Sequence, residues 1–313
     1  MTRRLRCAHN CRMVPRRARV FVTIVFAAMI SFVPRPTYAW GFDAHQFIME
    51  RAIAMLPLQI QPFFERHRAA LVERTIDPDT WLDAGFGDLE AHNHFIDLDS
   101  EGYGTYPFTE LPRDYAAAVA RFGRSRVEQN GTLPWRTEEM YGNLRRAFEA
   151  YARRGAFGRF GIVHHAAWLA HYVSDAHVPL HTVVNYDGQL TGQRGVHARF
   201  ESFLFERYRD ALTVTPTPRH AILDPRGFIF ETALAGTRLV PDLLRADADA
   251  LGTRDVYDDE YYAAFFTANR VVLERRLSES IAAVAAMITG AWEAAGQPAV
   301  PLAPPSPPQR RRP

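Results

Sequence analysis

The chain has 313 residues, 47% of them hydrophobic, so it is long enough to bury one large core or two smaller ones. Its 37 basic residues are all arginine, and 35 acidic residues nearly balance them. Once an N-terminal segment with eight of these arginines is set aside, 29 basic residues face 35 acidic ones, a net charge of −6. A net acidic body lacks the electrostatic footprint that usually accompanies nucleic-acid binding, which disfavours that class of function.

The first 39 residues have the layout of a secretory signal peptide. Seven arginines between residues 3 and 19 form a basic region, fourteen mostly apolar residues follow at 20–33, and Ala39 closes the segment. The apolar run is too short for a comfortable membrane span, which needs about 20 residues. We therefore expect export to the periplasm or out of the cell, cleavage before Trp40, and no transmembrane segment afterwards. The alternative is an uncleaved membrane anchor.

Both cysteines, Cys7 and Cys11, lie inside this N-terminal segment. The mature chain would therefore contain neither a disulfide nor a thiolate metal ligand. An exported protein of this length without disulfides must be stabilised by its core and by any metal that it binds.

Helical periodicity dominates the rest of the chain. It predicts helices over residues 44–55, 61–72, 137–154, 161–178, 196–212, 228–240, 257–273 and 277–295, and no run alternates long enough for a sheet. We expect an all-α protein with a single compact multi-helix domain over residues 40–296, monomeric in solution. Residues 297–313, rich in proline and arginine, predict a disordered tail.

The most informative motif is H-Y-V-S-D-A-H-V-P-L-H, followed after fifteen residues by H-A-R-F-E. It places His171 four residues before Asp175 and His197 four before Glu201, with His181 between the two pairs. A spacing of four stacks two side chains on one face of a helix. Imidazole nitrogen beside carboxylate oxygen is a ligand set that suits zinc. Two such pairs predict a multinuclear zinc site and hence a metallo-hydrolase.

A second motif stands directly after the expected cleavage site. Cleavage would make Trp40 the N-terminal residue, five residues before His45, and its amine and carbonyl could chelate zinc. W-G-F-D-A-H together with the first motif resembles the bacterial zinc-dependent phospholipase C family. That family shares its helical fold with the fungal single-strand-specific zinc nucleases. The resemblance covers residues 40 to about 207.

The resemblance implies three zinc ions per chain. Its expected ligands are Trp40, His45 and Asp175 for one ion, Asp79, His94, His171 and the bridging Asp175 for the second, and His181, His197 and Glu201 for the third. Asp79 is chosen because it stands fifteen residues before His94, close to the spacing in the family. Asp77 and Asp83 remain competitors for that position.

The resemblance also implies the reaction. A zinc-activated water would attack the phosphorus of a phosphodiester, and the third zinc would steady the departing alkoxide. Asp79 and Asp175 are the candidate catalytic residues, Asp79 for orienting the water or accepting its proton and Asp175 as the bridge.

Details of the motifs bear on the substrate. Glu201 closes its motif with glutamate, as in the phospholipases, whereas the five-residue spacing of Trp40 and His45 is that of the nucleases. Asp43 could attract a quaternary ammonium, but no aromatic cage for choline is evident. We expect a phospholipase C-like enzyme that acts on a phospholipid or another phosphodiester. The alternatives are a single-strand nuclease or nucleotidase, with nucleic acid only as substrate, and a non-catalytic zinc-binding protein.

Other polar residues are given structural roles. His177 is expected to support a ligand or to pack in the core, and His164 and His165 to pack or to support a ligand. Surface positions are expected for His67, His92 and His220, and a turn position for Asp187. The acidic and aromatic residues 257–262 are interpreted as a helix start and its solvated face.

Overall fold

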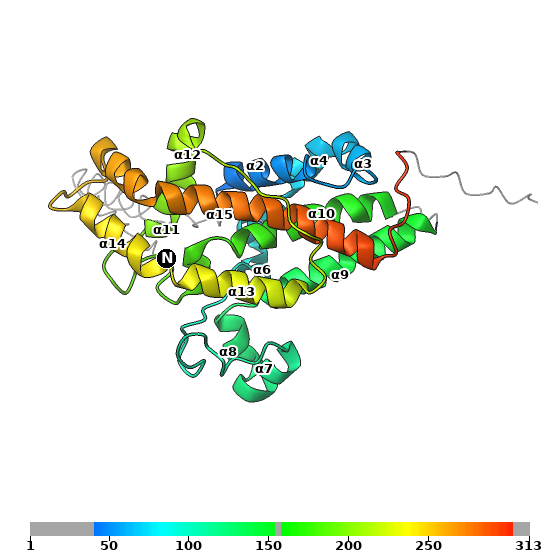
Figure 1. Ribbon diagram of the computed structural model, residues 1–313. Helices are drawn as coiled ribbons and strands as arrows, with labels where there is room; N and C mark the ends of the chain where they lie inside the picture. The colour runs from blue at the N-terminus through cyan, green and yellow to red at the C-terminus, as the bar shows by residue number, and fades with distance from the viewer. Residues whose placement is uncertain (1–40, 154–157, 303–313) are drawn as a thin grey trace, which may run out of the picture. The chain divides into compact units, whose positions relative to one another are not determined.

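The computed structural model describes residues 41–153 and 158–302, apart from the side chains of Asp83 and Asp88. Within these ranges all regular structure is helical and no strand occurs, which confirms the predicted all-α class (Figure 1). Trp40, the predicted signal peptide and the end of the predicted tail from residue 303 lie outside the described residues.

The central element is α10 (Gly158–Asp175), in which every residue from Ala166 to Asp175 is buried. A helix that is apolar on all sides is stable only when other helices surround it. It packs against α2 (Phe42–Ile53), α4 (Arg68–Arg74), α9 (Leu133–Ala152) and α15 (Asp259–Ala294). This packing places the last turn of α10, which carries His171 and Asp175, inside the protein.

The longest helix is α15, which runs past α2, α9 and α10 and also contacts α14 (Val240–Leu251) (Figure 1). The sequence predicted two helices here, 257–273 and 277–295, but the structure has one continuous helix of 36 residues. The intervening Glu274, Arg275 and Arg276 are good helix formers, so nothing interrupts the helix. Asp258 caps its start by accepting a hydrogen bond from the amide of Tyr261 at 2.8 Å.

The segment 77–112, which lies between two predicted helices, begins with a series of short helical turns. These are α5 (Asp77–Trp81), the π-helical η1 (Leu82–Phe86), α6 (Gly87–Glu90) and the 3₁₀ turn η2 (Ala91–Asn93). The predicted helix 61–72 divides at His67 into α3 (Gln61–Arg66) and α4. The predicted helix 196–212 contains α11 (Val196–Ala198), the π-helical η4 (Arg199–Phe203), α12 (Leu204–Tyr208) and η5 (Arg209–Ala211).

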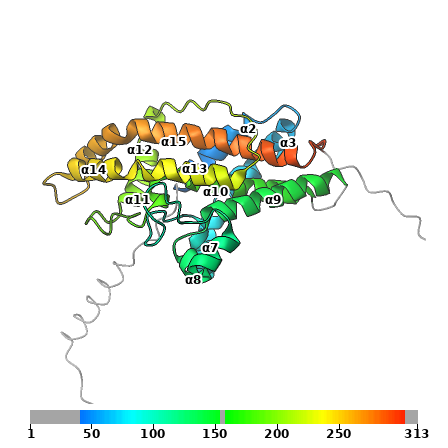
Figure 2. The same cartoon turned by 60° about the horizontal axis from the view of Figure 1, so that its bottom comes forward.

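Three helices complete the domain: α13 (Pro225–Thr237), α7 (Tyr115–Phe122) and α8 (Arg124–Gln129). The last two pack against each other and stand apart from the large helices in both ribbon views (Figures 1 and 2). They belong to a second, smaller hydrophobic core that also includes Trp135 of α9 and Phe230 of α13.

The chain segment after His94 runs beside the turn that follows α10. The amide of Ile96 donates to the carbonyl of His181 at 2.8 Å, and the amide of Leu98 donates to that of Thr182 at 3.1 Å. The 3₁₀ turn η3 (Pro179–Thr182) is thereby fastened to the chain that follows His94. These backbone bonds bring two predicted ligand segments together.

The packed part of the chain extends beyond residue 296. Trp292 donates its indole hydrogen to the carbonyl of Pro298 at 2.9 Å, Tyr151 donates its hydroxyl to that of Pro301 at 2.6 Å, and Val300 is buried. The first residues of the predicted tail are therefore part of the fold.

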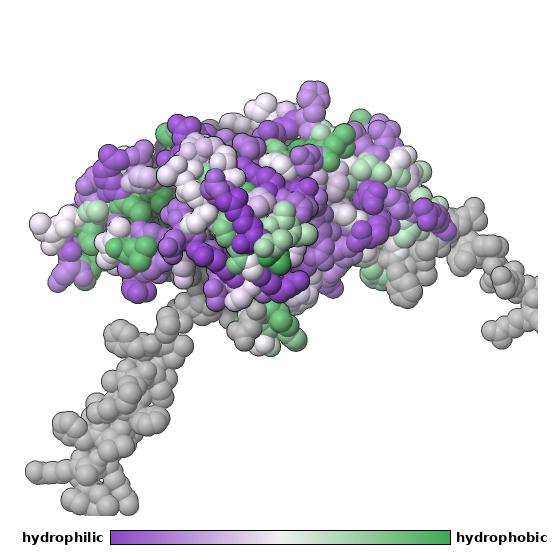
Figure 3. Space-filling model, turned by 90° about the horizontal axis from the view of Figure 1, so that it is seen from below, coloured by the Kyte–Doolittle hydropathy of each residue, from purple (hydrophilic) through white to green (hydrophobic). Residues whose placement is uncertain are grey.

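No helix in the described residues is long and apolar enough to cross a membrane. The face shown in Figure 3 is largely hydrophilic, with apolar residues interspersed.

Candidate metal centre

Three groups of buried histidine and carboxylate side chains lie in the interior. Within each group the possible ligand atoms are within 4.8 Å of one another: His45, His171 and Asp175; Asp79, His94 and His171; and His181, His197 and Glu201. The structure thus brings together all the predicted ligands that it describes, and each group could hold a metal ion. The remaining predicted ligand, Trp40, lies outside the described residues.

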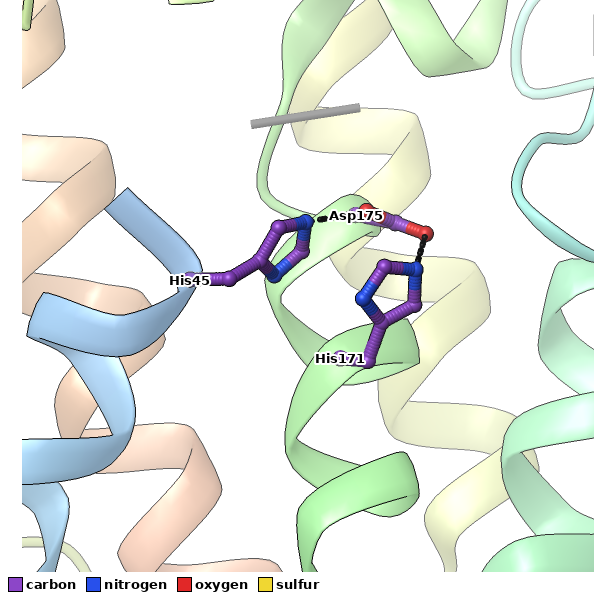
Figure 4. Close-up of side chains that lie close together, drawn as sticks. All are labelled: His45, His171 and Asp175. Atoms are coloured by element: carbon purple, nitrogen blue, oxygen red, sulfur yellow. Dashed lines mark ion pairs between the residues drawn. The ribbon is translucent and has the colours of Figure 1, made fainter. Parts of the chain in front are cut away.

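Asp175 lies where the first two groups meet. Its Oδ1 is 3.3 Å from Nε2 of His45, and its Oδ2 is 3.1 Å from Nδ1 of His94 and 3.3 Å from Nε2 of His171. Figure 4 shows His45 and His171 reaching this carboxylate from two different helices, α2 and α10. Oδ1 therefore faces His45 of the first group and Oδ2 faces His94 of the second. A carboxylate shared between two ions requires this arrangement.

Asp79 faces the same two groups from α5. Its Oδ1 is 3.6 Å from both Nδ1 of His94 and Nε2 of His171, and it is fully buried. Asp77 has a different environment, because its carboxylate accepts hydrogen bonds from Arg74 at 3.2 Å and Trp168 at 3.4 Å. The geometry favours Asp79 over Asp77 as the ligand, and the side chain of Asp83 is outside the described part.

The third group is built on the turn after α10 and on the helix that starts at Val196. Oε2 of Glu201 is 3.0 Å from Nε2 of His197 and 3.5 Å from Nε2 of His181. The two imidazole rings are almost perpendicular, at 88°. The predicted spacing of four residues brings His197 and Glu201 together even though a π-helical segment, η4, begins between them.

A buried ion pair holds the helix that carries this third group. Arg199 donates from NH2 to Oδ1 of Asp247 on α14 at 2.9 Å, and Tyr261 on α15 donates its hydroxyl to the same oxygen. Arg199 is 4% exposed, and Asp247 and Tyr261 are fully buried. The predicted solvated face at residues 257–262 is wrong for Tyr261 and Tyr262, which are buried, and the hydroxyl of Tyr261 pairs with Asp247.

Backbone carbonyls orient two of the imidazole rings. Nδ1 of His171 lies 2.8 Å from the carbonyl oxygen of Thr75, and Nδ1 of His181 is hydrogen-bonded to the carbonyl oxygen of His94. A carbonyl oxygen only accepts, so Nδ1 carries the proton in both rings. In each ring Nε2 is then the unprotonated nitrogen, and its lone pair points into the ligand group, as a metal ligand's must.

Electrostatics favour the protonation state that binds metals for His171 and Asp175. Burial lowers the pKa of His171 well below its usual value, which favours neutral imidazole. Burial opposes ionisation of Asp175, but the adjacent imidazoles of His171, His45 and His94 hold its pKa well below the usual range. His181 differs, because despite burial the carboxylates of Glu201 and Asp175 raise its pKa, so a cation would compete with a proton there.

The spacing of the ligand atoms fits zinc. Two atoms bound at about 2.0–2.2 Å to a tetrahedral zinc lie about 3.3–3.6 Å apart. Several distances within the three groups, from 3.0 Å between Nδ1 of His94 and Nε2 of His171 to 3.6 Å between Nδ1 of His94 and Oδ1 of Asp79, bracket this range, and all ligand atoms of a group lie within 4.8 Å of one another. Nε2 of His181 and Oδ1 of Asp175 are buried without a hydrogen-bond partner among the described residues. A bound cation would compensate these buried polar atoms, which are otherwise costly.

The residues expected to have structural roles are mostly in such positions. His177 is buried, and its Nδ1 is hydrogen-bonded to the carbonyl of Val173 at 2.7 Å, outside the three groups. The ring of His164 packs on Trp168 with centroids 4.1 Å apart. His67 was expected at the surface but is half-buried, with its ring against Phe63 at 4.7 Å.

Glu90 lies beside the candidate metal centre but is not among the predicted site residues. Glu90 is 4% exposed, and its Oε1 lies 3.8 Å from Nε2 of His94. The signal for it was in the sequence, because Glu90 stands four residues before His94, the same spacing that identified the other pairs.

No protein-family model matches this chain, and neither does any curated protein sequence. The functional assignment therefore depends on the geometry and chemistry of the three groups.

Proposed function

We propose that the chain is an exported, zinc-dependent phosphoesterase of the phospholipase C type, which binds three zinc ions and hydrolyses a phosphodiester. The observation that carries this proposal is the carboxylate of Asp175, whose two oxygens face different imidazole groups beside a third group of three ligands. Phosphoester hydrolysis is a common use of paired metal ions, which stabilise both the attacking and the leaving oxygen.

The chemistry divides between the metal and the chain. Bound zinc would supply positive charge and lower the pKa of water from about 15.7 to about 7. Asp175 would hold the imidazoles of His45, His94 and His171 in place, since its two oxygens already lie 3.1–3.3 Å from them. Asp79 would orient the attacking water and accept its proton, because its carboxylate faces the same imidazoles.

The third group supports a catalytic rather than a structural metal site. Structural zinc sites usually close their coordination with four protein ligands, whereas catalytic sites keep one position for water or substrate. His181, His197 and Glu201 are three, and no fourth residue joins them within the described part of the chain. The open position would receive a phosphate oxygen or the leaving group.

A single-strand nuclease or nucleotidase is the second candidate. Glu201 favours the phospholipases, while the five-residue spacing of Trp40 and His45 is the observation that favours the nucleases. The net charge of −6 after residue 39 makes a long nucleic acid the less favoured substrate.

A paired assay separates these candidates. The chain starting at Trp40 is offered phosphatidylcholine micelles and single-stranded DNA side by side, each with and without a chelator. Release of diacylglycerol that the chelator abolishes supports the phospholipase, and chelator-sensitive release of nucleotides would transfer the proposal to the nucleases. Asp175→Asn should abolish either activity, and Asp249→Asn, an exposed carboxylate on α14, is the control. Zinc binding without either activity would contradict the enzymatic proposal.

A further inference from the structure

A buried acidic side chain stands directly behind one of the candidate ligands. Nδ1 of His94 faces the centre, 3.1 Å from Asp175 and 3.0 Å from Nε2 of His171. Nε2 of the same ring points away and has no hydrogen-bond partner among the described residues. The carboxylate oxygen that lies beside it is Oε1 of Glu90, at 3.8 Å.

Glu90 is held by two donors from other helices. Tyr172, the residue after His171 on α10, donates its hydroxyl to Oε1 of Glu90. The guanidinium of Arg136 on α9 lies 3.6 Å from Oε2 of Glu90 and donates from Nε to the hydroxyl of Tyr172 at 3.2 Å. A buried carboxylate is tolerated when hydrogen bonds and an opposite charge compensate it, and both are present here.

The polar contacts around Glu90 form a connected series that continues to the surface. Arg136 also donates to Glu139 at 2.8 Å, so the series of polar contacts reaches from His94 to a side chain that is 55% exposed. Glu90 is not a member of any of the three ligand groups, so its position suits it to act on His94 and not on a metal directly.

We propose that Glu90 is a positioning residue for His94: with a metal at Nδ1, the carboxylate 3.8 Å from Nε2 would attract the hydrogen on that nitrogen and so favour the tautomer in which Nδ1 presents its lone pair to the metal. An imidazole that binds a metal through one nitrogen carries its proton on the other, and an oxygen acceptor there sets the orientation of the ring. His171 and His181 use backbone carbonyls for this purpose. Beside His94 the oxygen is a charged carboxylate instead, which would make this ring the more basic ligand. The inference rests on the proposed metal-dependent function.

The test uses the chain from Trp40 loaded with cobalt(II) in place of zinc. Glu90→Gln keeps the size of the side chain and removes its charge, and Glu139→Gln is the matched control at the exposed end of the same network. Loss of a carboxylate behind a ligating histidine typically lowers metal affinity by about 10–100-fold. We expect a loss of this size for one cobalt ion in Glu90→Gln, measured by chelator competition, and none in Glu139→Gln.

A second readout distinguishes positioning from a merely structural role. Ring N–H protons of cobalt-bound histidines give displaced, exchangeable proton NMR signals, and we expect that of His94 to shift or vanish in Glu90→Gln while those of His171 and His181 persist. Unchanged affinity and unchanged signals in Glu90→Gln would overturn the inference. If Glu90→Gln fails to fold, Tyr172→Phe, which leaves the carboxylate in place, should shift the same single signal by less, and an unshifted signal there would also overturn it.

The outcome for the unaltered chain separates this inference from the proposed function. A chain that binds no cobalt would contradict the metal centre itself, and with it any role for Glu90. A chain that binds cobalt and hydrolyses a phosphodiester equally well with and without Glu90 would contradict only the positioning role.

Discussion

The carbonyl oxygen of His94 accepts a hydrogen bond from Nδ1 of His181. His94 therefore contributes to two groups at once, through its ring to the one with Asp79 and His171 and through its backbone to the ring of His181. The neighbouring bonds from Ile96 and Leu98 to residues 181 and 182 hold the same contact. One segment of backbone thus sets the position of the third group relative to the other two. We expect a substitution in one of these groups to alter the geometry of the others.

Removing the shared carboxylate should have the largest effect on activity. Asp175→Asn removes the charge of the side chain and replaces one of its two oxygens by an NH2 group. Several kcal/mol of charge stabilisation by the metals is therefore lost. We expect kcat/KM to fall at least about 100-fold. The measurement is kcat/KM together with metal content by mass spectrometry. Retention of full metal content and activity in Asp175→Asn would contradict its assignment as a bridge.

The third group should be separable from the others. Glu201→Gln leaves the contacts among Asp79, Asp175 and His94 intact, since none of them involves Glu201. We expect the zinc content to fall by about one ion per chain, because a site of three ligands loses its only anionic one. Simultaneous loss of all metal would show instead that the groups bind cooperatively, against this expectation.

The ion pair of Arg199 and Asp247 should matter for both stability and the third group. Asp247→Asn leaves a buried guanidinium without its counter-charge, which typically destabilises a protein by about 3–5 kcal/mol. Since Arg199 stands between His197 and Glu201, metal binding there should also weaken. Denaturant unfolding and chelator competition are the measurements. Asp249→Asn, two residues further along α14 and exposed, should change stability by less than about 0.5 kcal/mol, and equal effects of the two variants would contradict the role of the ion pair.

Acid should destabilise the fold partly through His165. Burial, with help from His164 and Arg146, lowers its pKa from 6.5 to about 4. Because the folded state binds this proton less readily than the unfolded state, the contribution to stability is complete above pH 6.5 and is lost as the pH falls towards 4. His165→Gln should therefore flatten the decline of the unfolding free energy over this range. His220→Gln, at an exposed position, is the control, and an identical profile in both variants would contradict the contribution of the half-buried His165.

The sequence predicted which side chains lie together better than it predicted the helices that carry them. The spacing of four between His171 and Asp175 places both on one face of α10, and that information is local. The position of His45 beside Asp175 depends on how α2 packs on α10. The prediction that His45 is a ligand therefore comes from the family resemblance and not from residue spacing. Asp79 was uncertain for the same reason, because the turn of α5 that buries it while Asp77 pairs with Arg74 is decided by tertiary packing.

The predictions that failed concern interruptions and burial. The helix α15 continues through Glu274 because charged residues are good helix formers even where they break an apolar pattern. Tyr261 was assigned to a solvated face because acidic residues surround it in sequence, yet its partner Asp247 comes from another helix. Glu90 was overlooked although it stands four residues before His94, because the side chains that hold it, Arg136 and Tyr172, come from other helices.

The most direct test of the metal centre is anomalous X-ray diffraction at the zinc edge, from crystals of the chain starting at Trp40 and supplied with zinc. We expect three zinc peaks, two on either side of the Asp175 carboxylate and one among His181, His197 and Glu201. Crystals that contain zinc but show no anomalous peak within these three groups would contradict the central claim.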